Sequence, residues 1–117
     1  MTPHFTKEEL ECKCDCGIAN IAEKSLNKLE DFRNMLGIPF KPLSAARCIA
    51  HNRAEGGGKD SQHISTKTRK SKAFDIPEVT DKYYMAFLAG KAGFNAIGIY
   101  SWGIHIDDRD TPAFWIG

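Results

Sequence analysis

The sequence predicts an α+β domain in which helices flank a small antiparallel sheet. Three observations support this fold class: a helical stripe of apolar residues over 20–36, a second apolar run after Thr80, and two short alternating segments around residues 101–103. With 117 residues, 42% of them hydrophobic, the chain is long enough to bury its own core. We therefore expect a single domain over residues 1–117, with its helices packed on the sheet.

Two helix-start signals lie in the first third of the chain. Thr6–Glu9 has the pattern of a capping box, and it predicts a short helix that ends in a cysteine-rich turn. Asn20 with Glu23 repeats the signal, and a helix of about 16 residues is expected to follow and to end at Gly37. Its buried stripe is Leu26, Leu29, Phe32 and Leu36.

The middle of the chain is expected to be mostly irregular. Residues 39–49 read as an extended segment, and residues 50–62, rich in glycine, read as a long loop. A loop of that length in a compact domain is usually functional. Residues 72–76 are predicted to form a strand that carries Asp75.

A helix and a hairpin are predicted in the last third. Thr80 is expected to cap a helix that ends near Gly93. Residues 97–100 and 104–107 read as two strands joined by a tight turn. The residues expected on the buried face of the helix are Tyr84, Phe87 and Leu88.

Two histidines and one aspartate indicate a divalent-metal site. Imidazoles and carboxylates are zinc ligands, and a catalytic site keeps three of them with a fourth position open to water. His63, Asp75 and His105 supply that set. An isolated histidine is more often structural, but three such residues in supporting contexts favour a metal. Because strand residues two apart share a face, Asp107 should lie beside His105.

A second group of candidate residues is Ser44-x-x-Arg47. The guanidinium is always charged, and its fixed fork of donors matches a carboxylate. Near a metal, Arg47 could bind a terminal carboxylate of a substrate or stabilise the oxyanion of a tetrahedral intermediate. The alternative is an ordinary surface ion pair.

The four cysteines match no standard zinc-finger spacing. Reduced thiols are the default interpretation. There are two alternatives: a structural metal site that includes Cys48, and a disulfide. The four residues are Cys12, Cys14, Cys16 and Cys48.

The charge and hydropathy of the chain favour neither nucleic acid nor membrane as a partner. The net charge is +1, and there is no long apolar run or signal-peptide core. We therefore expect a cytoplasmic protein unless another component carries it out. Residues 64–72 form a basic segment, which is either a solvated loop or a region attracted to an anionic polymer. Its basic residues are Lys67, Arg69, Lys70 and Lys72.

The ordered motifs resemble the zinc D-alanyl-D-alanine carboxypeptidases and related murein endopeptidases. The opening from Phe5 to Gly17 is similar to that of phage-encoded members, and Trp115 near the end also fits. The motifs that carry the resemblance are Ser44-x-x-Arg47, Asn52, the glycines 56–58, Ser61-x-His63, Ala73-x-Asp75-Ile76, Gly98-x-Tyr100 and His105-x-Asp107.

The resemblance implies a fold shared with hedgehog signalling domains and a peptidase active on peptidoglycan. It implies Zn²⁺ held by His63, Asp75 and His105, with Arg47 binding the substrate or its transition state. Ser61 is expected to be a further substrate-binding residue. The implied reaction is hydrolysis of a stem or cross-link peptide bond by a metal-activated water. It further implies a monomeric phage enzyme, held in the host cytoplasm until release to the wall or carried in the virion, with a holin or virion protein as candidate partner.

The general base is the open point of this interpretation. Many relatives place an acidic residue three positions before the last ligand histidine, where this chain has Trp102. Asp107 could serve as the base or could orient His105, and Asp108 and His51 are further candidates. The alternative function is a wall-binding or structural phage protein that keeps the fold but cleaves slowly or not at all.

Overall fold

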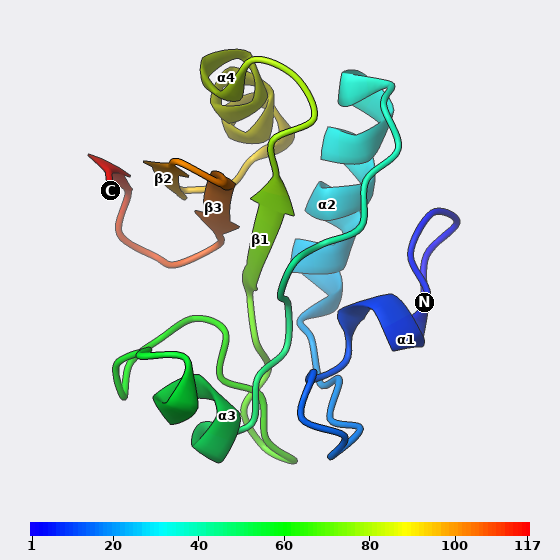
Figure 1. The fold of residues 1–117 in the computed structure, drawn as a ribbon. Coiled ribbons are helices and arrows are strands. Elements are labelled where there is room, and N and C mark those ends of the chain that lie inside the picture. Colours follow the sequence, from blue (N-terminus) through cyan, green and yellow to red (C-terminus); the bar gives the residue numbers. More distant parts are fainter.

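Four helices and one four-stranded sheet make up the computed structural model, which describes residues 1–117 (Figure 1). The α+β class predicted from the sequence is confirmed. The helices are α1 (Lys7–Leu10), α2 (Glu23–Leu36), α3 (Ile49–Ala54) and α4 (Lys82–Ala92), and the strands are β1 (Ala73–Pro77), β2 (Ala96–Tyr100), β3 (Gly103–Asp107) and β4 (Ala113–Ile116).

The sheet has the strand order β1-β3-β2-β4. The predicted hairpin of β2 and β3 is present, and β1 pairs antiparallel with the other side of β3. Strand β4 was not predicted, and it pairs parallel with β2, so the sheet is mixed and not purely antiparallel. The register aligns Asp75, His105, Gly98 and Trp115 in one row across the four strands.

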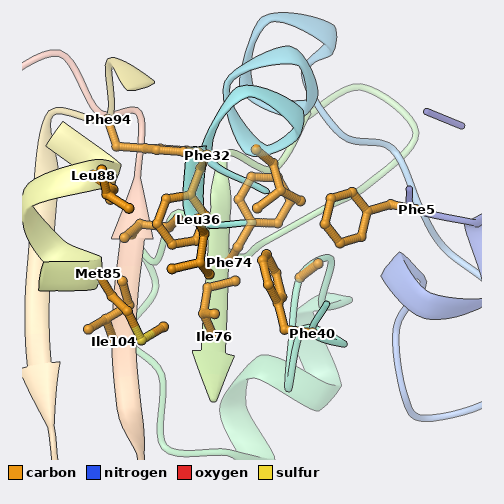
Figure 2. Packing of buried hydrophobic residues seen from close by; sticks show 14 of the residues in the cluster. Phe5, Phe32, Leu36, Phe40, Phe74, Ile76, Met85, Leu88, Phe94 and Ile104 are labelled. Atoms are coloured by element: carbon orange, nitrogen blue, oxygen red, sulfur yellow. The ribbon is translucent and has the colours of Figure 1, made fainter. Parts of the chain in front are cut away.

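Alternation along the strands gives the sheet one apolar and one polar face. Ile104 and Ile106 are fully buried and lie in the hydrophobic core with Phe74 and Ile76 of β1. Helices α2 and α4 cover this face, and Figure 2 shows Phe32 of α2 among these side chains. Burying a phenylalanine of this kind contributes about 1.5–3 kcal/mol to folding. Asp75, His105 and Asp107 consequently point to the other face.

The helix predictions near the N-terminus hold in part. The capping box of α1 is present, with the Thr6 hydroxyl accepting from the Glu9 amide, and α2 ends at Gly37 in the left-handed conformation (φ 69°). The predicted cap at Asn20 is wrong, because Ala22 precedes α2 and offers no side-chain acceptor. The side-chain amide of Asn20 instead donates to the Thr66 carbonyl over 2.7 Å, which anchors the basic segment to the body of the protein.

Helix α4 begins one residue later than predicted. The Asp81 carboxylate, not Thr80, caps it by accepting from the backbone amides of Tyr83 and Tyr84. Leu88 is buried as expected, but Tyr84 and Phe87 are 50% and 61% exposed. Apolar residues occur on all sides of this helix, so the spacing alone does not identify the buried face. Its core contacts come from Met85, Ala86, Leu88 and Ala89.

The segment between α2 and β1 departs most from prediction. Residues 50–62 were expected to be a loop, but they contain most of α3, which the Cys48 thiol caps by accepting from the His51 amide. Residues 39–49 form no strand and make only isolated bridges, Ser44 to Asp75 and Arg47 to Ile64. No helix combines the length and the apolar character that crossing a bilayer requires.

Candidate functional site

Three residues from separate parts of the chain converge on the polar face of the sheet. The distance from His63 Nε2 to Asp75 Oδ1 is 3.2 Å, and from His105 Nδ1 to the same oxygen it is 3.0 Å. The ligand atoms of all three residues lie within 4.8 Å of one another. The basic segment between His63 and Asp75 therefore does not separate them.

The backbone explains how this convergence arises. Asp75 in β1 lies directly opposite His105 in β3, so both side chains leave the sheet at the same point. His63 follows the α3 region, and its carbonyl accepts from the Arg47 amide over 2.8 Å. This pairing holds the segment around Arg47 between β1 and residues 63–65, because Leu43 and Ser44 also bond the backbone of Asp75.

Hydrogen bonds fix which ring nitrogen of each histidine faces the shared point. His63 Nδ1 lies 2.7 Å from the Ala45 carbonyl, which can only accept, so that nitrogen carries the proton and Nε2 faces Asp75. His105 Nε2 lies 2.7 Å from Asp107 Oδ2 and donates to it, which leaves Nδ1 facing Asp75. Three lone pairs thus converge, an arrangement that requires a cation among them, either a proton or a metal ion.

The surroundings of Asp107 favour an orienting role over that of a base. Its side chain is fully buried. Arg109 donates to Oδ1 from its backbone and Nε and to Oδ2 from Nη2, over 2.6–3.0 Å. Burial raises the pKa of Asp107, but the hydrogen bonds from Arg109 and His105 outweigh it and lower the pKa to about 2. Both oxygens are thus engaged, and the carboxylate has no free lone pair directed at the solvent side.

The pKa values of the other two sheet residues move in opposite directions. Burial alone raises the pKa of Asp75, but hydrogen bonds with His105 and His63 hold it well below the ordinary range. Burial alone lowers the pKa of His105, but its bonds with Asp107 and Asp75 raise the pKa above the ordinary value. Each shift favours the charged form, as expected where opposite charges lie in contact.

Arg47 is mostly buried within this group of residues and does not form a surface ion pair. Its Nη2 lies 3.1 Å from Asp75 Oδ2, the oxygen turned away from the histidines, and its side chain is only 13% exposed. Nε donates to the Ser44 hydroxyl over 2.9 Å, and Nη1 lies 3.5 Å from Asn52 Oδ1. The guanidinium is therefore held in one orientation beside the carboxylate.

Two cavities open onto these residues and share Arg47, Asp75 and Trp102. The first, of about 410 Å³, is also lined by Lys13, Leu43, Ser44, His51 and Glu55. The second, of about 250 Å³, is also lined by Ser61, His63, Tyr100 and His105. A ligand lying across both would meet the guanidinium on one side and the three converging side chains on the other.

Aromatic residues form a wall of this cleft. Trp102 stacks on Tyr100 with ring centroids 5.0 Å apart, and the Tyr100 hydroxyl accepts from Trp115 Nε1 over 2.7 Å. The Trp115 ring lies over Gly98, where a Cβ atom would approach the ring to 2.4 Å, so only glycine fits there. The Trp115 ring also contacts that of His105, with centroids 5.5 Å apart.

The remaining sequence candidates lie in different surroundings. The Ser61 hydroxyl accepts from the His63 amide over 3.2 Å and lines the smaller cavity. Asp108 is paired with Lys28 at 2.6 Å and is absent from the cleft lining. His51 Nε2 lies 3.5 Å from Glu55 Oε1, and both line the larger cavity. Arg109 and Glu55 were not predicted from the sequence, because their only signal was a charge close to a candidate residue.

Comparison with known proteins agrees with this geometry. A search of curated proteins found no match to the chain. A family model described as peptidase M15 matches residues 3–107, which include the converging residues and Arg47. Members of this family are zinc-dependent metallopeptidases. The chain belongs to the peptidase M15 family.

Proposed function

We propose that this peptidase acts on peptidoglycan, as a D-alanyl-D-alanine carboxypeptidase or as an endopeptidase of the stem or cross-link peptide, and that it is of phage type. The single observation that carries the proposal is the position of Arg47 beside the converging histidines and aspartate in one cleft. A cationic fork next to a three-ligand set suits a short peptide with a carboxylate near the bond to be cut.

The residues present fit a zinc ion. Two imidazole nitrogens and one carboxylate oxygen form the ligand set of catalytic zinc sites, and the protonated nitrogens point away to Ala45 and Asp107. We assign the ligand atoms as His63 Nε2, Asp75 Oδ1 and His105 Nδ1. Zinc bound there supplies a Lewis acid and lowers the pKa of a water molecule to near neutrality.

The other residues of the cleft bind and orient the peptide. Arg47 donates to the substrate carboxylate or to the oxygen that gains charge at the scissile carbonyl. Ser61 faces the smaller cavity and is placed to donate to the same peptide. The stacked Tyr100 and Trp102 present an apolar wall that excludes water from one side.

The proton acceptor is assigned by exclusion within the cleft. Asp107 accepts a hydrogen bond from His105 Nε2 and is a positioning residue, since both of its oxygens accept hydrogen bonds already. His51, paired with Glu55, is the remaining candidate and lines the larger cavity, and its Nε2 is the proposed acceptor.

Digestion of purified peptidoglycan, followed by mass spectrometry of the soluble products, tests this function. The zinc-loaded protein is expected to release D-alanine or to cut a stem or cross-link bond, and a chelator is expected to stop the release. The fraction of the protein retained on intact sacculi measures wall binding. Stoichiometric zinc and wall binding without product would support the alternative, a non-catalytic wall-binding phage protein. That alternative is motivated by Trp102, which stands where many relatives have an acidic residue. The absence of both wall binding and product would contradict the proposal.

An Asp107→Asn substitution distinguishes the orienting role from that of a base. Because a residue behind a zinc-binding histidine typically contributes about 10–100-fold to metal affinity, we expect zinc to bind more weakly by that factor. At saturating zinc, kcat should fall much less than affinity does. The measurements are competition with a zinc chelator and turnover at high zinc.

The opposite result would assign the proton transfer to Asp107. In that case zinc affinity would stay the same and kcat at saturating zinc would drop by about 10²–10⁴-fold. Asp108→Asn is the matched control, since that neighbouring carboxylate pairs with Lys28 and lies outside the cleft. Both properties should remain at the wild-type level in this variant.

A further inference from the structure

Four thiols from two distant segments meet beside α3. The turn after α1 supplies Cys12, Cys14 and Cys16, and the fourth thiol is that of Cys48, the residue that caps α3. The four sulfur atoms all lie within 4.8 Å of one another. Cys12 Sγ is 3.3 Å from Cys14 Sγ, and Cys14 Sγ is 3.5 Å from Cys48 Sγ.

These distances suit a tetrahedral metal site. All four residues are free thiols, and the Sγ–Sγ distances of 3.3 and 3.5 Å are well above the length of a disulfide bond, about 2.05 Å. A Zn–S bond of about 2.3 Å places the corners of a tetrahedron about 3.8 Å apart, so only a small expansion is needed to admit an ion. Of the three states considered from the sequence (reduced thiols, a metal site and a disulfide), the geometry favours the metal site.

The backbone of the turn is shaped so that the three alternate thiols face inward. Asp15 and Gly17 both adopt the left-handed conformation, with φ of 70° and 74°. The Cys12 amide donates to the Ile18 carbonyl over 2.8 Å, which closes the turn on itself. A left-handed aspartate is uncommon, and here it reverses the chain between the second and third cysteine.

Two backbone amides already donate to the sulfur atoms. The Cys48 amide lies 3.4 Å from Cys12 Sγ, and the His51 amide lies 3.3 Å from Cys48 Sγ. Such N–H···S contacts stabilise negative charge on sulfur, which is the form that binds metal. No side-chain carboxylate or imidazole belongs to the cluster, so the donor set is purely sulfur.

We propose that Cys12, Cys14, Cys16 and Cys48 form a structural site for Zn²⁺ that is separate from the catalytic ligands. Four protein ligands close the coordination shell, so this ion has no open position for a substrate. The site joins the turn after α1 to Cys48, which follows Arg47 directly and caps α3. It thereby holds the segment that carries Arg47, His51 and Asn52 against the N-terminal region.

Cobalt substitution in a His63→Ala background tests this site alone. That variant lacks one catalytic ligand, so we expect about one equivalent of Co²⁺ to bind with a strong thiolate-to-metal charge-transfer band, and Zn²⁺ to displace it. Adding Cys14→Ser should abolish the band. Metal analysis of proteins loaded with zinc should give about two equivalents for wild type and about one for each single variant.

Two further readouts keep the test decisive. Chelation should lower the melting temperature of His63→Ala but leave that of His63→Ala/Cys14→Ser unchanged, and circular dichroism reports whether the double variant folds. Should it not fold, the cobalt spectrum of His63→Ala decides alone. Absence of a charge-transfer band would overturn the proposal, as would fewer than four thiols titratable in denaturant with a chelator after purification without reductant. Its failure is separate from that of the peptidase proposal, which depends on product release.

Discussion

Replacing His63 with alanine is expected to remove the catalytic zinc and to reduce peptide hydrolysis by at least about 10³-fold. His63 is 3% exposed and presents a single lone pair, through Nε2, to the point where three ligand atoms converge. Only Asp75 and His105 would remain, and two protein ligands do not hold zinc at micromolar concentrations against a chelator. The measurements are zinc content after dialysis and the rate of product release from peptidoglycan.

His4→Ala is the matched control for that substitution. His4 lies at the N-terminus, where its ring contacts Glu30, and it lines neither cavity of the cleft. This variant should keep both zinc equivalents and the wild-type rate. If His63→Ala kept the catalytic zinc and the activity, the assignment of the ligand set would be wrong, whatever the behaviour of the cysteine site.

The second large effect is expected for Arg47→Ala. Loss of a donor that stabilises the charged transition state typically costs about 10²–10³-fold in rate, or about 2.7–4 kcal/mol. We expect kcat/KM to fall by that factor while the catalytic zinc is retained, since the three ligand atoms stay in place. Arg47→Lys should recover little of the loss, because an ammonium group lacks the planar fork that contacts Ser44 and Asp75 together.

A peptide with an amidated C-terminus separates the two roles proposed for Arg47. If the guanidinium binds the substrate carboxylate, amidation should lower the kcat/KM of the wild-type enzyme strongly and that of Arg47→Ala hardly at all. The reason is that the effects of removing two partners in contact are not additive. If it stabilises the oxyanion, amidation should affect both proteins equally. A kcat/KM within a few-fold of wild type for Arg47→Ala on both peptides would exclude either role.

The sequence predicted the parts of the site that depend on local periodicity. Alternation in β3 is enough to place His105 and Asp107 on one face and Ile104 on the other, because successive strand residues point to opposite sides. The contact between His63 and Asp75 is of another kind. It depends on the path of residues 64–72, which fold back because Asn20 bonds the Thr66 carbonyl, and no local pattern contains that information.

The parts that sequence analysis missed have specific physical causes. Helix α3 has six residues and a cysteine cap, so neither an apolar stripe nor a Ser, Thr, Asp or Asn cap marks its start. Strand β4 is four residues long and pairs parallel with β2, from which β3 separates it in the chain, so the contact is non-local. The acceptor for His63 is a backbone carbonyl, that of Ala45, and any residue could supply it.

The carboxylate of Asp75 divides its two oxygens between two neighbours. Oδ1 faces the histidines and Oδ2 faces Arg47. An engineer who exchanged Asp75 for histidine or cysteine to change the metal preference would therefore also release the guanidinium from its only carboxylate partner. Metal preference and peptide affinity are for this reason not separately adjustable traits in this protein. A variant selected for a different ion should need a compensating change near Ser44 or Asn52 before it regains a well-positioned arginine.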